Sequence, residues 1–298
     1  SDFTTVSYLA RGWSEPNLVG YMESHDEERL NYKNITYGNS SGTYNIKFMP
    51  TAVKRMELAS VFFYPVAGPK MIWQFGELGY DISINFNGRL GIKPAKWDYY
   101  ENINRKRLYT VTSKLIALKK TEPVFQTSDY YMNVGGAIKT IRWNGTDNTV
   151  IAIGNFDVTS RNYTVNFPSA GTWYDYFWAD SLVLENPSVQ ISLQPGEYRF
   201  YSSKKLNGFG SINIGFDAPI ASEKIRIYPN PARNQINITG AGKIKSIVIY
   251  TLPGKVMMEK FPGSDKETID ISGLPEGMYF LRTCYDNAFE TSRFVKMQ

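Results

Sequence analysis

The pattern of apolar and polar positions changes along the chain and divides it into regions of different character. In the first region, residues 18–22 and 70–75 are short apolar runs of strand length. Residues 50–64 and 105–120 instead repeat apolar side chains every three or four positions, which predicts two helices packed on a sheet. Pro65 and Pro123 end these helical patterns. The order strand, helix, strand, helix predicts one βαβ unit followed by a further helix.

Two stretches without a clear period separate these elements. Residues 31–49 are rich in Asn, Ser, Gly and Tyr and predict a long loop. Residues 76–103 are rich in glycine and aromatic residues and predict a second loop. A long loop after a strand is often functional, and the alternative is a surface excursion without a function.

From residue 124 the apolar positions alternate, which is typical of strands. Six short strands are predicted between turn sequences such as Asn-Gly and Gln-Pro-Gly-Glu, at residues 137–143, 149–155, 163–167, 173–178, 189–193 and 198–202. They predict an antiparallel β-sandwich over residues 124–205. Residues 206–222 are rich in glycine and small side chains, so we expect a linker there. A second set of short β runs occupies residues 223–298.

Composition narrows the classes of function. With 42% hydrophobic and 15% aromatic residues, the 298-residue chain has ample material for packed cores. Its 33 basic and 28 acidic residues give a net charge of +5 without a concentrated basic block, so we expect no nucleic-acid partner. No apolar run approaches the ~18 residues of a transmembrane helix, so we expect no membrane span. Cys284 is the single cysteine, which excludes an intrachain disulfide and a cysteine-based metal site.

The start of the chain carries its own expectation. The first residue is Ser rather than Met, and no signal peptide precedes the first elements. We therefore expect that the biological start lies elsewhere.

The candidate chemistry lies where the first apolar run ends. Residues 18–22 are followed by a polar turn that contains His25 and Asp26, and His25 is the single histidine of the chain. Barrel and open α/β enzymes keep their chemistry at the carboxyl ends of parallel strands, so an imidazole and a carboxylate there form a candidate site. The alternative is a strand followed by a solvated acidic loop.

The run VGYMESHDEER around this pair resembles the fourth conserved region of the α-amylase family of glycoside hydrolases, family 13, at the end of the seventh barrel strand. The resemblance implies that Asp26 stabilises the transition state and that His25 hydrogen-bonds the same sugar. The segments WQFGELGYD and NGRLGIKPAKWDYY resemble the last barrel strand and its loop. Because sugar rings stack on aromatic faces, Tyr80, Phe86 and Trp97 are candidate substrate contacts, and the alternative for each is a place in the core.

The two β regions carry resemblances of their own. Residues 124–205, which include LQPGEYRFY, resemble the β domain that follows the barrel in α-amylases. Residues 223–298 contain IRIYPNPARNQINI, IVIYTLPGKVM and IDISGLPEGMYFLR, and resemble the type IX secretion sorting domain of many exported proteins of Bacteroidota. This implies the type IX machinery as a partner and a secreted or cell-surface location. The alternative is a generic β-sandwich for carbohydrate or protein contact.

Together these resemblances imply an α/β plus all-β chain. Residues 1–123 correspond to the last two strand-helix units of a (β/α)8 barrel, residues 124–205 to an antiparallel β-sandwich, and residues 223–298 to a small sorting β-sandwich. In the family, the nucleophile and the acid/base lie on the fourth and fifth strands, which have no counterpart here. Two of eight units cannot close a barrel.

The resemblance therefore implies part of a secreted, retaining glycoside hydrolase that acts on α-1,4-glucans, with its nucleophile and acid/base outside this chain. A branching enzyme or glucanotransferase is the alternative within enzymes, and a noncatalytic cell-surface starch-binding protein is the alternative of another class. We expect no metal or cofactor in this chain, although calcium is possible in the absent part. If the chain alone were active, the next candidate carboxylates would be Glu23, Glu27, Glu28 and Glu77.

Overall fold

The computed structural model describes residues 2–210, 225–239, 243–251, 256–284 and 289–297. The chain forms two compact units, Ser1–Gly215 and Phe216–Gln298. The predicted linker, residues 206–222, lies outside the described residues from position 211 onward.

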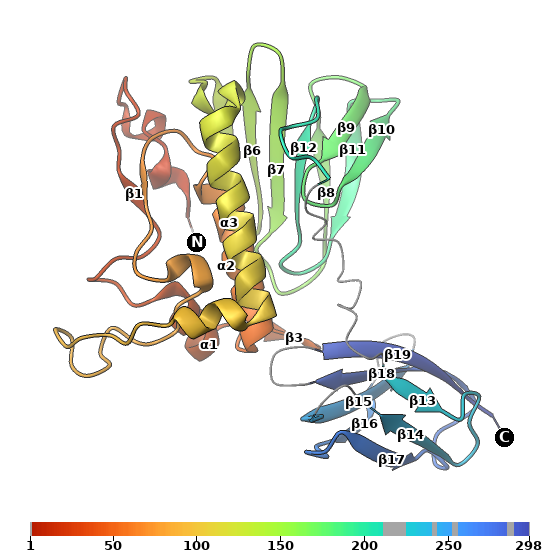
Figure 1. Cartoon of the computed structure of the whole chain (residues 1–298). Coiled ribbons are helices and arrows are strands. Elements are labelled where there is room, and N and C mark those ends of the chain that lie inside the picture. The colour runs from red at the N-terminus through yellow and green to blue at the C-terminus, as the bar shows by residue number, and fades with distance from the viewer. Residues whose placement is uncertain (1, 211–224, 240–242, 252–255, 285–288, 298) are drawn as a thin grey trace. The chain divides into compact units, whose positions relative to one another are not determined.

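The first unit begins with mixed α and β elements (Figure 1). They are η1 (Thr4–Val6), η2 (Leu9–Arg11), β1 (Gly20–Tyr21), α1 (Leu30–Tyr37), β2 (Ser40–Ser41), β3 (Tyr44–Asn45), α2 (Met49–Phe63), β4 (Lys70–Met71), η3 (Gly76–Leu78), η4 (Trp97–Glu101), α3 (Ile103–Thr121) and η5 (Pro123–Gln126). The predicted strand-helix-strand order is confirmed, since β1 and β4 are parallel neighbours joined through α2. Each strand is only two residues long, and within the described residues each has the other as its single ladder partner.

The prediction of a loop over residues 31–49 is wrong in its first half, which forms α1. This helix lacks an apolar stripe, so periodicity does not reveal it. Its buried Asn31 donates from Nδ2 to the Gly79 carbonyl oxygen at 2.7 Å, and Asn34 donates to the Ala52 carbonyl oxygen at 3.2 Å. Polar side chains that bond to distant backbone groups therefore hold this helix in place. The second half of the stretch contains the short hairpin of β2 and β3.

The two predicted amphipathic helices are confirmed as α2 and α3. Asn102 caps α3, because its side-chain oxygen accepts hydrogen bonds from the amides of Asn104 at 3.1 Å and Arg105 at 3.3 Å. The two helices pack against each other and cover one face of a six-stranded sheet (Figure 1).

The antiparallel sheets that follow confirm the predicted change of period. The six-stranded sheet has the order β10-β9-β12-β7-β6-β5, and β11 pairs with β8 in a second sheet. The strands are β5 (Tyr130–Asn133), β6 (Ile138–Asn144), β7 (Thr149–Asn155), β8 (Arg161–Asn166), β9 (Gly171–Asp175), β10 (Asp180–Leu184), β11 (Ser188–Leu193) and β12 (Tyr198–Ser202). The sequence pattern missed β5 and β10, which are the two edges of the large sheet. The sequences of these strands, YYMN for β5 and DSLVL for β10, do not alternate between apolar and polar residues, and their side chains are less buried than those of β7.

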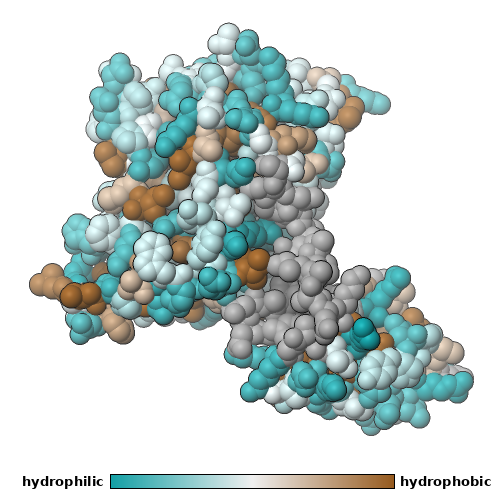
Figure 2. Space-filling model, in the orientation of Figure 1, coloured by the Kyte–Doolittle hydropathy of each residue, from teal (hydrophilic) through white to brown (hydrophobic). Residues whose placement is uncertain are grey.

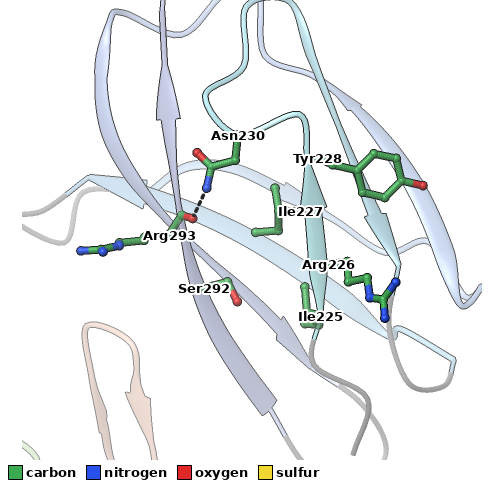
Figure 3. Close-up of a pocket in the computed structure, with 7 residues that line it drawn as sticks. All are labelled: Ile225, Arg226, Ile227, Tyr228, Asn230, Ser292 and Arg293. Atoms are coloured by element: carbon green, nitrogen blue, oxygen red, sulfur yellow. Dashed lines mark hydrogen bonds between the residues drawn. The ribbon is translucent and has the colours of Figure 1, made fainter.

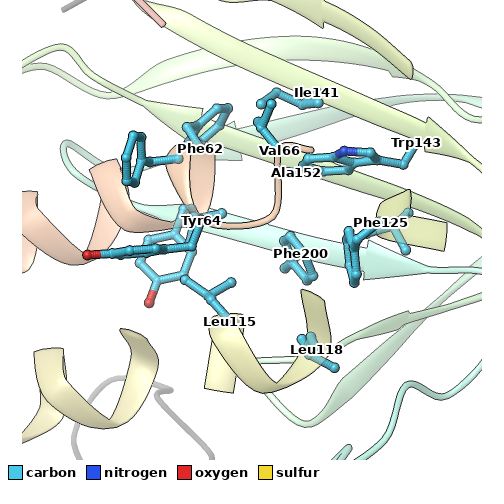
Figure 4. Packing of buried hydrophobic residues seen from close by; sticks show 14 of the residues in the cluster. Phe62, Tyr64, Val66, Leu115, Leu118, Phe125, Ile141, Trp143, Ala152 and Phe200 are labelled. Carbon is cyan, nitrogen blue, oxygen red and sulfur yellow. The ribbon is translucent and has the colours of Figure 1, made fainter. Parts of the chain in front are cut away.

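The centre of the six-stranded sheet, at β7, is buried on both faces. Along β7, Val150 and Ala152 point to the helices, whereas Ile151 and Ile153 point to the second sheet. Figure 4 shows the helix side, where α2 and α3 meet a cluster that includes Trp143. Gly154 permits this close approach, since a Cβ there would lie 2.5 Å from Leu58 Cδ1 and 2.8 Å from Phe62 Cε2.

The second unit is a β-sandwich with its own apolar core. Its sheets are β13-β14-β17 and β16-β15-β18-β19, formed by β13 (Arg226–Tyr228), β14 (Gln235–Thr239), β15 (Ser246–Thr251), β16 (Val256–Lys260), β17 (Lys266–Asp270), β18 (Gly277–Cys284) and β19 (Phe289–Lys296). Isoleucines dominate the core between the sheets.

Candidate functional site

The His25-Asp26 turn follows β1 and faces solvent. The side chains of His25 and Asp26 are 71% and 66% exposed, and the Nε2 to Oδ2 distance is 3.4 Å. The imidazole ring lies 5.7 Å from the ring of Trp73, which follows β4. The ends of two parallel strands therefore come together beside an exposed imidazole and carboxylate.

A buried ion pair holds the His25-Asp26 turn in place. Glu23 and Arg29 are 5% and 2% exposed, and their Oε1 and Nη2 atoms lie 2.9 Å apart. The Leu30 amide donates to Glu23 Oε2 at 2.8 Å, and the Arg29 guanidinium donates to the Gln74 carbonyl oxygen. Burial raises the pKa of Glu23, while Arg29 and the Leu30 amide act in the opposite direction. Because Arg29 bonds to the backbone beyond β4, this pair fixes the end of β1 to the end of β4.

The other acidic residues of the turn also have structural partners. Glu28 accepts hydrogen bonds from Ser83 Oγ at 2.6 Å and from the Ile84 amide at 3.0 Å. Partial burial acts to raise the pKa of Glu28, but these hydrogen bonds lower it below its usual value. Ser24 Oγ donates to the Glu27 carboxylate. Glu28 thus anchors the loop that follows β4.

That loop continues into a compact turn that touches Asp26. Arg89 Nη2 donates to the Asp26 carbonyl oxygen at 2.8 Å and lies 3.6 Å from Asp26 Oδ1. Lys93 Nζ lies within hydrogen-bonding distance of four carbonyl oxygens of residues 86–91, so its three N–H groups hold the turn together. Leu90 and Ile92 remain 100% and 87% exposed. Figure 2 shows hydrophobic surface at the tip of this loop.

The base of the same loop is attached to α3. Arg105 Nη2 lies 2.6 Å from Asp81 Oδ2, and Arg105 Nη1 donates to the Leu78 carbonyl oxygen at 2.9 Å. The Tyr99 hydroxyl donates to the same carboxylate of Asp81. The Arg105 guanidinium carbon lies 3.7 Å from the centre of the Tyr99 ring. These contacts make the loop a defined part of the fold.

The three candidate aromatic contacts differ in exposure, and Phe86 is 51% exposed. Tyr80 is 1% exposed, its hydroxyl donates to the Pro94 carbonyl oxygen at 2.6 Å, and its ring stacks on Phe75 at 5.9 Å. The Arg29 guanidinium carbon lies 4.7 Å from the Tyr80 ring centre. Trp97 is 75% exposed and touches Phe75 at a ring distance of 4.8 Å. Trp97 therefore offers a free aromatic face, whereas Tyr80 supports the loop from within.

The sequence prediction does not include two residues that matter to this geometry, Arg29 and Arg89. Arg29 stands directly after the acidic turn, and an arginine that follows several glutamates is a signal for an ion pair between them. Arg89 has no local signal, because its contact with Asp26 spans 63 positions.

In the described part of the chain, no cluster of three or more His, Cys, Asp or Glu residues could hold a metal ion. Within the same residues, no helix combines the length and the apolar character needed to cross a bilayer.

Comparisons with known proteins match the second unit to a protein family and part of the chain to solved structures of similar fold. Residues 226–297 match the family described as secretion system C-terminal sorting domain. No curated protein matches the chain in sequence. Among solved structures, AmyP in complex with maltose is 16% identical with a TM-score of 0.51, over 66% of this chain and 43% of that one. An AmyP variant in complex with maltotriose has the same identity and coverage with a TM-score of 0.50.

A third solved structure, the α-amylase of Anoxybacillus, is 15% identical with a TM-score of 0.47, over 63% of this chain and 38% of that one. The chain thus spans about two fifths of the length of the structures that it resembles. At these identities the likeness is one of fold. The protein therefore combines an α-amylase-like fold over part of its length with a C-terminal secretion sorting domain, which indicates a secreted or cell-surface protein.

Proposed function

We propose that this chain is part of a secreted, retaining glycoside hydrolase that acts on α-1,4-glucans. The observation that carries the proposal is the exposed His25-Asp26 pair at the joined ends of β1 and β4, within an amylase-like fold. In this proposal β1 and β4 are the seventh and eighth barrel strands, and α2 and α3 are their helices. The solved complexes of AmyP with maltose and maltotriose are consistent with a glucan substrate.

The proposed roles follow from charge and exposure. A glycosidic bond breaks through a transition state with oxocarbenium character, so a fixed carboxylate nearby lowers its energy. Asp26 supplies this carboxylate, and its hydrogen-bonding capacity also suits sugar hydroxyls. His25 hydrogen-bonds the same sugar, and Arg89 positions the backbone of Asp26. Trp97 offers its exposed face for stacking on another sugar ring.

The covalent chemistry needs two further groups. A retaining glycosidase uses a nucleophile and an acid/base whose carboxyl groups lie about 5 to 5.5 Å apart. In this proposal both come from a part of the enzyme outside this chain. Exposed Val19, Tyr21 and Ile72 at β1 and β4 are consistent with elements that pack there in the whole enzyme.

The first experiment tests for complementation. The purified chain should release no reducing sugar from maltoheptaose, and addition of the upstream portion of the protein should restore release. In the complete enzyme, Asp26→Asn should lower kcat by several orders of magnitude, because the lost interaction exists mainly in the transition state. Asp147→Asn, at an exposed turn of the sandwich, is the matched control and should leave kcat unchanged. Retention of more than about a tenth of the rate by Asp26→Asn, a loss under ~1.4 kcal/mol, would overturn the role of Asp26.

Activity from the chain alone would also contradict the proposal. If Asp26→Asn then abolished that activity, the nucleophile and the acid/base would have to come from within the chain. The next residues to test would be Glu23, Glu27, Glu28 and Glu77, each substituted by Gln.

Two other functions share these residues. A branching enzyme or glucanotransferase would give longer or branched products in the same reaction, so product analysis by chromatography distinguishes them. The exposed Trp97 is also compatible with noncatalytic starch binding at the cell surface. In that case the complete protein would bind amylose without turnover, whatever residue stood at position 26.

For the second unit we propose that the export route is type IX secretion. A reporter with an N-terminal signal peptide and residues 223–298 at its C-terminus should cross the outer membrane of a type IX-competent bacterium. The same reporter without these residues should remain in the periplasm, and equal export of both would refute the proposal.

A further inference from the structure

The sorting domain has an open groove between the edges of its two sheets. Its volume is about 450 Å³, and it is lined by Ile225, Arg226, Ile227, Tyr228, Asn230, Ser292 and Arg293. Strand β13 is the end of one sheet and β19 the end of the other. Within the described residues, β13 has β14 as its only ladder partner, and β19 has β18 together with one isolated bridge at Ala232. Among the residues that the structure describes, no strand lies between these two strand edges, which face each other across the groove (Figure 3).

The chain itself fills one end of this gap. Asn230 Nδ2 donates to the Arg293 carbonyl oxygen at 3.1 Å, and the Val295 amide donates to Asn230 Oδ1 at 3.0 Å. The side chain of Asn230 thus bonds the edge of β19 in the way that the backbone of a neighbouring strand would. Ala232 continues the pairing, since its amide donates to the Val295 carbonyl oxygen at 2.8 Å. The YPNP segment of the sequence therefore marks where strand-like pairing with β19 begins.

The lining of the groove combines an apolar inner side with positive charge outside. In Figure 3, Ile227 points from β13 toward β19, whereas Tyr228 lies on the opposite side of β13. Arg226 and Arg293 are both exposed. The described lining contains no acidic residue. A strand placed in the groove would alternate in the same way, with apolar side chains inward and charged side chains outward.

We propose that this groove binds an extended acidic segment of the secretion machinery as an added β-strand. Main-chain hydrogen bonds to the strand edges supply affinity, and the arginines at positions 226 and 293 select acidic side chains on the outer face of the added strand. Edge strands are otherwise a liability for aggregation, and the two exposed arginines are consistent with an edge reserved for an acidic partner. The inference rests on the sorting role of this domain and not on glucan hydrolysis.

The first test uses the full chain and a short peptide of alternating Asp and Val as the probe. At low salt the peptide should bind at least tenfold more tightly than the same peptide with Lys in place of Asp, and the difference should shrink at high salt. Methylation of alternate backbone nitrogens of the peptide should abolish binding, because a methylated amide cannot join a ladder. Equal binding of the acidic and basic peptides, or undiminished binding of the methylated one, would overturn the proposal.

Charge reversal then locates the binding site. The double variant Arg226→Glu with Arg293→Glu should lose at least tenfold in affinity for the acidic peptide. The matched control, Lys243→Glu with Lys266→Glu, makes the same change of charge at exposed positions outside the groove and should bind as the unchanged chain does. Equal loss in both variants would show a general charge effect and would refute a specific groove.

The same variants test the groove in cells. In a type IX-competent bacterium, the exported fraction of the full chain with a signal peptide should fall about tenfold with the arginine variant and stay constant with the lysine control. Deletion of residues 223–298 serves as the reference. If the deletion leaves export unchanged, the sorting role itself fails. If the deletion blocks export and the arginine variant does not, the sorting role stands and the groove proposal is wrong.

Discussion

Two half-buried lysines donate hydrogen bonds to the same backbone carbonyl groups in the turn between α2 and β4. Lys70 Nζ donates to the carbonyl oxygens of Val66 at 2.9 Å, Ala67 at 3.1 Å and Gly68 at 2.9 Å. Lys119 Nζ, from α3, donates to the same oxygen of Val66 at 2.7 Å and to that of Gly68. Burial, together with the charge of Lys119 and a hydrogen bond with Lys119, lowers the pKa of Lys70 to about 7. We expect Lys70→Met to stabilise the first unit at neutral pH.

The magnitude follows from the change in the pKa of Lys70. A fall from 10.5 to about 7 corresponds to about 5 kcal/mol of unfavourable free energy when the amine is charged in the folded state. The substitution also removes three hydrogen bonds, at about 0.5 to 1.5 kcal/mol each. We therefore expect a net gain of about 2 kcal/mol below pH 7. In the unchanged chain the folded state binds fewer protons than the unfolded state between pH 7 and 10.5, so its stability rises over this range.

The assay is urea unfolding followed by tryptophan fluorescence at a series of pH values. All six tryptophans lie at positions 13 to 178, so the signal reports on the first unit and not on the sorting domain. The stability of the unchanged chain should rise by at least ~2 kcal/mol between pH 7 and 10, and Lys70→Met should lack this rise. Subtracting the stability of Lys70→Met from that of the unchanged chain at each pH removes the contribution of other titrating groups.

A double-mutant cycle separates the repulsion between the Lys70 and Lys119 ammonium groups from the effect of packing a Met side chain. After Lys70→Met, Lys119 still holds the oxygens of Val66 and Gly68, and the reverse is true after Lys119→Met. The double variant leaves both carbonyl groups without an ammonium, so it should be less stable than the sum of the single changes implies. Identical pH profiles for the unchanged chain and Lys70→Met, together with additive substitutions, would refute this reasoning.

Three further predictions concern the core, the sandwich and the candidate site. Phe200→Ala should lower the free energy of unfolding by about 3 to 5 kcal/mol in the same urea assay, because this side chain is 0% exposed among other aromatic rings. Burial raises the pKa of Asp175 to about 6 despite its ion pair with Arg199, so the associated stability is present below pH 3.8 and is lost as the pH rises through 6. Asp175→Asn should flatten that dependence, and an unchanged slope would contradict it. Trp97→Ala should weaken maltoheptaose binding by about tenfold in calorimetry, whereas Tyr80→Phe should leave binding unchanged and lower stability by about 1 kcal/mol.

The parts of the fold that sequence could predict are those with a regular apolar period. Helices α2 and α3 bury one stripe each, and β7 buries both faces, so their patterns stand out from the surrounding sequence. Helix α1 has no such stripe, and its position depends on bonds from Asn31 and Asn34 to distant carbonyl groups. Local sequence carries no record of those partners.

In the candidate site too, some features can be predicted from the sequence and others cannot. The end of an apolar run at His25 and Asp26 is visible in the sequence, because strand and turn are local features. The difference between Tyr80 and Trp97 is not visible, since both stand in the same glycine-rich loop. Only the tertiary contact of Tyr80 with the Pro94 carbonyl group and the Arg29 guanidinium decides which ring is buried.

The six-stranded sheet packs against the helices on one face and against the second sheet on the other. This limits how the chain can be divided into fragments. The predicted boundary at residues 123 and 124 falls between α3 and the sandwich. However, Trp143, Ala152 and Phe200 on the helix-facing side of the sheet pack in one cluster with Leu115 of α3. A fragment that began at residue 124 would expose this whole apolar face to water. Such a fragment would need new polar side chains on that face to remain in solution. The helices and the sandwich are thus best cloned, expressed and transferred to other proteins as a single cassette.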